Sequence, residues 1–579
     1  MSDRHTIDAG LTELRTARRE SRALYWAVGL FSFFANLLML TGPLYMLNVY
    51  DRVLGSRSVE TLIALSLLVA FLYGIMGILD YVRGRVMGRA GARFQSRLDR
   101  RVFEATMRQA SLGVEEQRNT GLRDLESVQR LMTSPVLMAL FDIPWTPIFL
   151  AGIAIFHPWL GILAISGGAA LIIVTLLNQW LTSQPVSSAN AALYHAENMG
   201  AQFRDEAEMV KAMGMTEAAF RRWQIARDKS LSSTIETADL SGTFTAMTKS
   251  FRLFLQSAML GLGAYLVLRG ELSAGAMIAA SILLGRALAP VELAIGQWAV
   301  VQRAGKGWNS LAQLLGANAP GAARTDLPKP KAQLDVQQLT VVPPGEKQAA
   351  LRMLSFTVGP GTAVGVIGMS GAGKSTLARA LTGVWRPAGG KIRLDGASLD
   401  QYDPEVLGQH IGYLPQRIQL FDGTITENIA RLSLSPDPKK VVDAAKRAAA
   451  HEMILRLPDG YDTRVSATGG RLSGGQIQRI GLARAMYGDP VILVLDEPNS
   501  NLDNEGSLAL NAAIRKTKEE GRSVLIMAHR PAAIQECEQL LVIENGARKA
   551  FGPKEEVLRE MVTNHKDISA GGIRKGGVT

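Results

Sequence analysis

The sequence predicts two domains in series, an α-helical membrane domain followed by an α/β domain, and three observations lead to this fold class. Hydrophobic residues make up 47% of the 579 residues, more than an ordinary soluble protein carries. Apolar runs of about 20 residues, enough to cross about 30 Å of hydrocarbon, cluster before Val300. Beyond that point short apolar strands alternate with helical segments.

Six apolar runs predict six membrane helices. Their expected bounds are Leu24–Leu44, Leu62–Val82, Val136–Phe156, Trp159–Leu181, Phe251–Leu268 and Ala274–Ile295. Short connections alternate with two long charged ones, residues 83–135 and 182–250. Arginine-rich flanks are poorly translocated, so we expect the long connections and the N-terminus in the cytoplasm. The net charge of +11 is explained by this topology, and no nucleic-acid partner is expected.

The two long connections have helical periodicity with little Pro or Gly, which predicts helical hairpins that extend beyond the bilayer. The pattern breaks at Ser111–Gly121 and Met213–Glu217, where we expect the hairpin tips and contacts with the second domain. Asp142, Arg286 and Glu292 lie at membrane depth. A charge there is costly, so these three either line a transport pathway or lie near the cytoplasmic end and meet water.

Composition also predicts the domain boundaries. They are a cytoplasmic N-terminal segment (residues 1–23), the membrane domain (24–316), a linker rich in Pro and small residues (317–332), the α/β domain (333–562) and a disordered tail (563–579). The first apolar run follows too long a polar stretch for a cleaved signal peptide. The single cysteine, Cys537, excludes intrachain disulfides.

The stretch AVGVIG leads into GMSGAGKS and then a helical run, the arrangement of a P-loop. Backbone N–H groups of such a loop surround a phosphate chain, the Lys374 ammonium reaches the terminal phosphates, and the Ser375 hydroxyl ligates Mg²⁺. The predicted ATP-binding residues are Gly368, Met369, Ser370, Gly371, Ala372, Gly373, Lys374, Ser375 and Thr376. The second domain is therefore an α/β P-loop NTPase domain.

A second strand, VILVLDEP, carries two acidic residues at its end. Asp496 is suited to hold Mg²⁺ through water, and Glu497 to polarise the attacking water. The expected cofactors are ATP and Mg²⁺.

Between these motifs, LSGGQIQR opens an amphipathic helix. Here the sequence resembles the ABC transporter family, whose signature is LSGGQ, and the other motifs follow in the family's order. The resemblance assigns Gln416 to the Q-loop, as a magnesium and catalytic residue, Asp503 to the D-loop and His529 to a γ-phosphate contact. It implies that Ser473, Gly474, Gly475 and Gln476 complete the ATP site of a second copy, and thus a homodimer.

Two stretches depart from the family pattern. LTVVPPGEK offers only Val341, Val342 and Pro343 where an aromatic residue usually stacks on adenine, and SATGGR lacks the usual glutamate of exporters. The sequence therefore supplies no stacking residue for adenine at these three positions and no glutamate of this kind before the signature.

Membrane helices ahead of one ATPase domain resemble ABC exporters, and Leu40–Leu54 and Met277–Glu292 resemble the type I protein secretion ATPases of the protease-exporting kind. That resemblance implies a bacterial inner membrane, a periplasmic adaptor, an outer-membrane channel, and unfolded cargo with a C-terminal signal, including glycine-rich calcium-binding repeat proteins. Two alternatives stay open: an exporter of lipids or hydrophobic small molecules, and a membrane-anchored regulatory ATPase without cargo.

Overall fold

The computed structural model describes residues 2–112, 121–319, 324, 327–466, 472–502, 504–529 and 531–561. These residues divide into two compact units, one with helices α1 to α13 and the other with the strands and helices from β1 onward.

The first unit is entirely helical in its described part. Its elements are α1 (Ser2–Arg19), α2 (Arg22–Leu38), α3 (Thr41–Asn48), the π-helix η1 (Val49–Val53), α4 (Leu54–Ser56), α5 (Val59–Ser111), α6 (Gly121–Met132), α7 (Pro135–Asp142), the 3₁₀-helix η3 (Ile143–Trp145), α8 (Thr146–Phe156), α9 (Pro158–Asp205), α10 (Ala207–Ala212), α11 (Thr216–Leu268), α12 (Ala274–Gly296) and α13 (Trp298–Ala317). Six stretches are long and apolar enough to cross a membrane, which confirms the six predicted spans.

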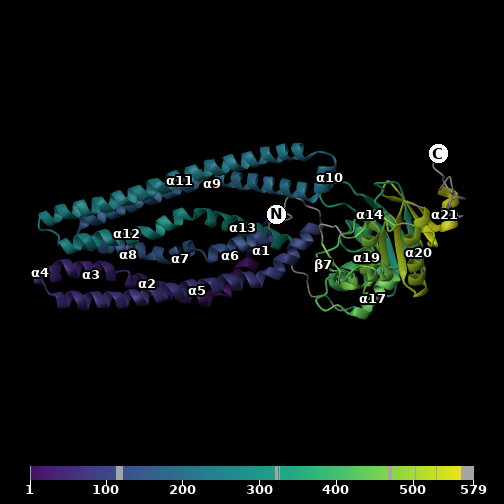
Figure 1. Ribbon diagram of the computed structural model, residues 1–579, viewed down its shortest axis with the longest axis horizontal. Coiled ribbons are helices and arrows are strands. Elements are labelled where there is room, and N and C mark those ends of the chain that lie inside the picture. Colours follow the sequence, from purple (N-terminus) through teal and green to yellow (C-terminus); the bar gives the residue numbers. More distant parts are fainter. Residues whose placement is uncertain are drawn as a thin grey trace. The chain divides into compact units, whose positions relative to one another are not determined.

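Three of these spans continue as long helices well beyond hydrocarbon length. α5 and α11 each have 53 residues and α9 has 48. α9 and α11 lie side by side along their length (Figure 1), joined through α10 and a turn at Met213–Met215. The second predicted hairpin tip coincides with that turn. The first lies between α5 and α6, mostly outside the described residues.

Prolines divide the first and third spans into segments. The first span changes from α2 to α3 just before Pro43, and the third passes through η3, which contains Pro144, before α8 with Pro147 in its first turn. Proline has no N–H for the preceding turn but fits the start of a helix, so each break falls where a new helix begins.

The charged residues at membrane depth have different environments. The Asp142 carboxylate pairs with the Arg83 guanidinium at 2.9 Å and accepts a 2.6 Å hydrogen bond from Asn36. Arg83 lies on the second span, Asp142 on the third and Asn36 on the first, so these contacts tie the first three spans together. Both charged side chains are nearly buried. Glu292 pairs with Arg252 at 3.0 Å. Arg286 is exposed, and no ion pair joins it to another described residue.

One end of the helical unit is a four-helix cluster of α1, α5, α6 and α13. Leu14, Phe94, Leu125 and Leu311 are fully or almost fully buried in its core. A Cβ atom at Gly10 of α1 would overlap the Ala312 carbonyl oxygen of α13. The N-terminal segment is thus a packed helix, held against α13 by a close backbone approach that glycine permits.

The second unit contains a six-stranded sheet in the order β12-β11-β3-β10-β9-β6, parallel except for β12, and a four-stranded antiparallel sheet in the order β2-β1-β4-β5. Its strands are β1 (Leu334–Val341), β2 (Leu351–Val358), β3 (Ala363–Ile367), β4 (Gly389–Leu394), β5 (Ala397–Ser398), β6 (Ile411–Leu414), β7 (Gly423–Thr424), β8 (Arg464–Val465), β9 (Ile492–Asp496), β10 (Ser523–Ala528), β11 (Gln539–Glu544) and β12 (Ala547–Pro553).

Helices accompany these strands, as expected for an α/β fold. They are α14 (Lys374–Leu381), α15 (Pro404–His410), α16 (Ile425–Ile429), α17 (Pro438–Arg447), α18 (His451–Leu455), α19 (Gly474–Met486), α20 (Asn504–Glu519) and α21 (Lys554–Met561), with 3₁₀ turns η4 (Leu399–Gln401), η5 (Gly460–Asp462) and η6 (Pro531–Ile534). The central strands β9 and β10 are completely buried, and they carry functional residues at their carboxyl ends.

Candidate nucleotide site

Four parallel strands place the candidate residues along one edge of the six-stranded sheet. β3 runs into the P-loop, β9 ends at Asp496 before Glu497, β10 ends before His529, and β6 ends two residues before Gln416. Because the strands are parallel neighbours, their carboxyl ends meet at this edge, where ligands bind in open α/β sheets.

The P-loop connects β3 to α14 through glycines in special conformations. Gly371 and Gly373 have φ of +80° and +102°, which a side chain would strain. A Cβ atom at Gly368 would overlap the Ile543 carbonyl oxygen of β11. These constraints explain glycine at all three positions, and α14 directs the N–H groups of its first turn toward an anion.

Lys374 is the first residue of α14 and is almost fully buried. Its ammonium donates to the carbonyl oxygens of Gly368 and Met369 at 2.8 and 2.9 Å. Burial lowers the pKa of Lys374, and the carboxylates of Glu497 and Asp496 oppose that shift. The lysine side chain is thus fixed inside the loop by two carbonyl oxygens, positioned for phosphate.

The carboxyl group of Asp496 is the most deeply buried acid of this edge. The residue is only 2% exposed, and its Oδ1 has no hydrogen-bond partner in the described part of the chain. Burial raises the pKa of Asp496, whereas a hydrogen bond with Ser375 lowers it. A buried carboxylate oxygen without a partner, next to a hydroxyl, suits a hard cation such as Mg²⁺, so the residues present fit this ion.

Glu497 lies between two other candidate residues. Its Oε1 is 2.9 Å from Nε2 of His529, and its Oε2 accepts a 3.1 Å hydrogen bond from the Gln416 amide. The Glu497 backbone has φ of +51°, in the left-handed region that non-glycine residues seldom occupy. Such strain concentrates at functional sites, and it is tolerated here because the Glu497 N–H bonds the Met527 carbonyl oxygen.

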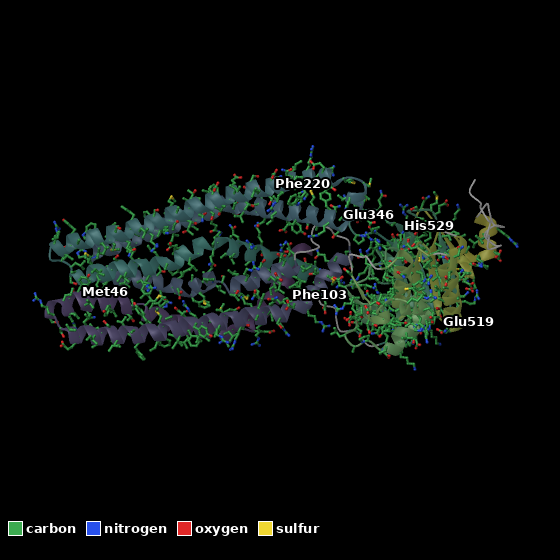
Figure 2. The ribbon with its side chains drawn as sticks, in the orientation of Figure 1. Met46, Phe103, Phe220, Glu346, Glu519 and His529 are labelled. Carbon is green, nitrogen blue, oxygen red and sulfur yellow. The ribbon has the colours of Figure 1, made fainter. Side chains whose placement is uncertain are left out.

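His529 lies between the P-loop lysine and the Glu497 carboxylate. Its Nδ1 is 3.5 Å from the Lys374 ammonium, on the ring side opposite the contact with Glu497. The residue itself is labelled in Figure 2. The structure therefore brings Lys374, Asp496, Glu497, Gln416 and His529 into one connected cluster.

The signature sequence forms the start of α19. Ser473 is its N-cap, and its hydroxyl accepts from the Gln476 N–H at 3.3 Å while the Gln476 side chain accepts from the Ser473 N–H at 2.8 Å. A Cβ atom at Gly475 would come within 3.1 Å of the Asn501 carbonyl oxygen. A capping serine and two glycines leave an open helix N-terminus, which favours anions.

The base-binding surface is less complete. Val341 and Pro343 are buried, so neither presents a free face to an adenine ring. Asp503 and residues 467–471, which contain most of the SATGGR stretch, lie outside the described residues.

One feature was missed by sequence reasoning: the pair of Arg83 with Asp142 and its hydrogen bond from Asn36. The indications in the sequence were Asp142 within one apolar run and Arg83 directly after another.

Comparison with known proteins agrees with this architecture. The family model described as "ABC transporter" matches residues 351–500, and "ABC transporter transmembrane region" matches residues 25–289. A bacterial Atm1-family ABC exporter with ATP bound has the same fold, with a TM-score of 0.79 at 23% identity, covering 96% of this chain and 99% of that one.

Proteins with similar sequences indicate a more specific group within this family. The chain is 43% identical to the type I secretion system ATP-binding protein PrsD of Rhizobium meliloti (strain 1021), over 94% of both chains. It is 28% identical to the toxin RTX-I translocation ATP-binding protein of Actinobacillus pleuropneumoniae, over 91% of this chain and 75% of that protein. The chain therefore belongs to the ABC transporter family of ATP-hydrolysing membrane transporters and, within it, to the type I secretion ATP-binding proteins.

Proposed function

We propose that the chain is one subunit of a homodimeric exporter that uses ATP to move unfolded proteins with a C-terminal secretion signal across a bacterial inner membrane. The observation that carries this proposal is the 43% identity to a type I secretion ATP-binding protein over nearly the whole of both chains. A relative named for toxin translocation supports the same class of cargo. The alternatives predict no dependence of any secreted protein on this chain.

In the proposed cycle, the P-loop holds the phosphates of ATP and Lys374 neutralises their terminal charge. Glu497 polarises the attacking water through its carboxylate, while His529 contacts the γ-phosphate and Gln416 orients the carboxylate. The hydrogen bonds of Glu497 to both partners support these roles. Ser375, Asp496 and Gln416 would hold Mg²⁺, which supplies charge neutralisation of the β- and γ-phosphates when bound.

The homodimer is proposed because the sequence contains a single P-loop and a single LSGGQ motif. In the proposed arrangement, Ser473, Gly474, Gly475 and Gln476 of one copy close the P-loop site of the other, with Asp503 at the same junction. The open N-terminus of α19, which favours anions, supports this role. Two copies would place twelve helices in the membrane.

The remaining partners and the location follow from the secretion role. We propose that the ATPase domain and N-terminus face the cytoplasm, that a periplasmic adaptor and an outer-membrane channel continue the path, and that cargo includes glycine-rich calcium-binding repeat proteins. The arginines that flank the spans support this orientation. The hairpin tips would carry motion from the ATPase domain to the spans.

The test is secretion by cells that lack this chain but retain the adaptor and channel. Plasmid-borne wild type is expected to restore a secreted protein with a C-terminal signal to the medium, whereas Lys374→Ala and Glu497→Gln are expected to leave it inside. Membrane levels of each variant serve as the control. If the variants secrete as wild type does, or if removing the C-terminal signal changes nothing, the proposed function is wrong.

A further inference from the structure

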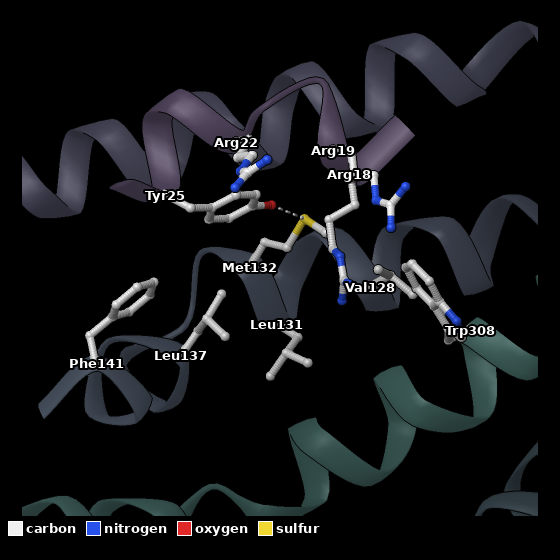
Figure 3. Close-up of a pocket in the computed structure, with 10 residues that line it drawn as sticks. All are labelled: Arg18, Arg19, Arg22, Tyr25, Val128, Leu131, Met132, Leu137, Phe141 and Trp308. Atoms are coloured by element: carbon white, nitrogen blue, oxygen red, sulfur yellow. Dashed lines mark hydrogen bonds between the residues drawn. The ribbon is translucent and has the colours of Figure 1, made fainter. Parts of the chain in front are cut away.

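A cavity of about 450 Å³ opens in the helical unit where the first and third spans begin. Its wall combines arginines of α1 and α2 with apolar residues of α6, α7 and α13 (Figure 3). This volume lies within the usual range of ligand sites, and neither the nucleotide site nor the spans' packing accounts for it.

The charge on this cavity is uncompensated. Arg18, Arg19 and Arg22 line it, and no ion pair joins any of them to a carboxylate among the described residues. Two acids of the segment that carries these arginines are engaged elsewhere, because Glu20 pairs with Arg97 at 3.4 Å and Glu13 pairs with another arginine of α5. Three clustered guanidinium groups without an acid favour an anion with several oxygens.

Two further contacts keep polar groups at the cavity. The Arg18 guanidinium lies 5.9 Å from the centre of the Trp308 ring, a cation–π contact that holds it beside the opening. Within the residues that the structure describes, the one hydrogen-bond contact of the Tyr25 hydroxyl is with the sulfur of Met132, at 3.9 Å. Because a thioether is a weak acceptor, this hydroxyl can turn to an anionic oxygen instead.

The rest of the lining is apolar and leads into the membrane. Leu137 and Phe141 belong to α7, in the first turns of the third span, and Arg22 is the first residue of the first span. From Arg22, the positions one and two helical turns along α2 are Trp26 and Leu30, which are 69% and 56% exposed. An anion held at Arg22 would therefore have an exposed apolar stripe beside it, directed into the hydrocarbon.

We propose that this cavity binds an anionic phospholipid of the adjoining leaflet, with its phosphate among Arg18, Arg19 and Arg22 and its acyl chains along Trp26 and Leu30. Basic pockets between membrane helices are suited to such headgroups. A lipid fits better than an acidic peptide, because the cavity lies where hydrocarbon begins and an apolar stripe continues from its cationic end. The site would couple the packing of α1, α2, α6 and α13 to the lipid around the protein.

The test uses fluorescence of the purified full-length chain in vesicles that contain phosphatidylglycerol or phosphatidylcholine with brominated acyl chains. Bromine quenches tryptophan only at short range, and subtracting the Trp26→Phe variant isolates the signal of the tryptophan beside the proposed acyl chains. We expect phosphatidylglycerol to quench the Trp26 signal more strongly than phosphatidylcholine at equal mole fraction. Equal quenching by the two lipids would overturn the proposal.

The variant Arg18→Gln/Arg19→Gln/Arg22→Gln is expected to abolish this preference. Its matched control is Arg15→Gln/Arg89→Gln/Arg93→Gln, which removes the same charge from exposed arginines that do not line the cavity, and it is expected to keep the preference. If the first variant does not fold, Arg22→Gln alone is expected to reduce the preference at least twofold. If the control variant loses the preference for phosphatidylglycerol to the same extent, the preference arises from general surface charge and the proposed lipid site is wrong.

Two competitors decide the identity of the anion. Inorganic phosphate and a short polyglutamate peptide, added at millimolar concentration, are both expected to leave the preference for phosphatidylglycerol unchanged. Restored fluorescence with phosphate would mean a free-phosphate site, and with the peptide an acidic polypeptide site. Either result would contradict the lipid assignment.

Discussion

Replacing Glu497 by Gln tests the chemistry of the nucleotide site most sharply. The carboxamide keeps the size of the side chain but has no negative charge with which to polarise water. Among the described residues, the carboxylate of Glu497 has hydrogen-bond or ion-pair contacts with two side chains, His529 at 2.9 Å and Gln416 at 3.1 Å, and both can still bond an amide. The substitution therefore removes the base and little else, so folding and ATP affinity are expected to stay near wild type.

The expected loss is that of a general base. Such groups contribute about 10²- to 10⁴-fold in rate, which corresponds to about 2.7–5.4 kcal/mol of transition-state free energy. The assay is phosphate release by purified protein at saturating ATP, with ATP affinity measured separately. Glu519→Gln, an exposed position on α20 labelled in Figure 2, makes the same charge change away from the site and is expected to keep the wild-type rate.

A double variant tests whether the contact between Glu497 and His529 reflects joint action. If the two side chains work as a unit, Glu497→Gln/His529→Ala loses about as much rate as the more damaging single substitution. A kcat for Glu497→Gln within tenfold of wild type would refute the assignment of this carboxylate as the base.

Three other predictions concern stability and reactivity. Asp142→Asn removes one of the two carboxylates that Arg83 contacts, the other being Asp80 at 3.0 Å, and is expected to destabilise the helical unit by about 1.5–3 kcal/mol, seen as a lower unfolding temperature in detergent. Gly10→Ala is expected to lower that temperature by steric overlap with α13, whereas Gly305→Ala, with no atom near its Cβ, is expected to raise it. Burial raises the pKa of Cys537 to about 12 from 9.0, so its thiol is expected to resist iodoacetamide at pH 8 until the protein unfolds. Since the folded value is the higher one, this contribution to stability is constant below pH 9 and is lost between pH 9 and 12.

Hydropathy was sufficient to predict the six spans, because a membrane helix satisfies its backbone internally and only its length and apolarity matter. It could not predict where the spans break. Pro43 and Pro144 indicated kinks, but the segment bounds depend on how neighbouring helices pack. The pairing of Arg83 with Asp142 was also beyond sequence reasoning, since these residues lie 59 positions apart and on different spans.

The nucleotide site could be predicted in larger part, because its motifs end strands that are parallel neighbours. Strand order brings Lys374, Asp496 and His529 together once the sheet forms. The left-handed backbone of Glu497 has no indication in the sequence, since a non-glycine residue gives no warning of positive φ. The helix of residues 2–19 was not predicted, because its few apolar residues indicated a polar segment. Leu14 and Ala17 are nevertheless buried against neighbouring helices.

The most direct test of cargo-coupled ATP hydrolysis is the ATPase rate of the purified full-length chain with and without the C-terminal segment of a secreted repeat protein. A scrambled segment of the same composition is the peptide control, and Lys374→Ala is the blank. The account predicts that the native segment changes the wild-type rate and the scrambled one does not. No response to the native segment, together with stimulation by lipids or hydrophobic amines, would contradict protein export and favour a transporter of small hydrophobic molecules.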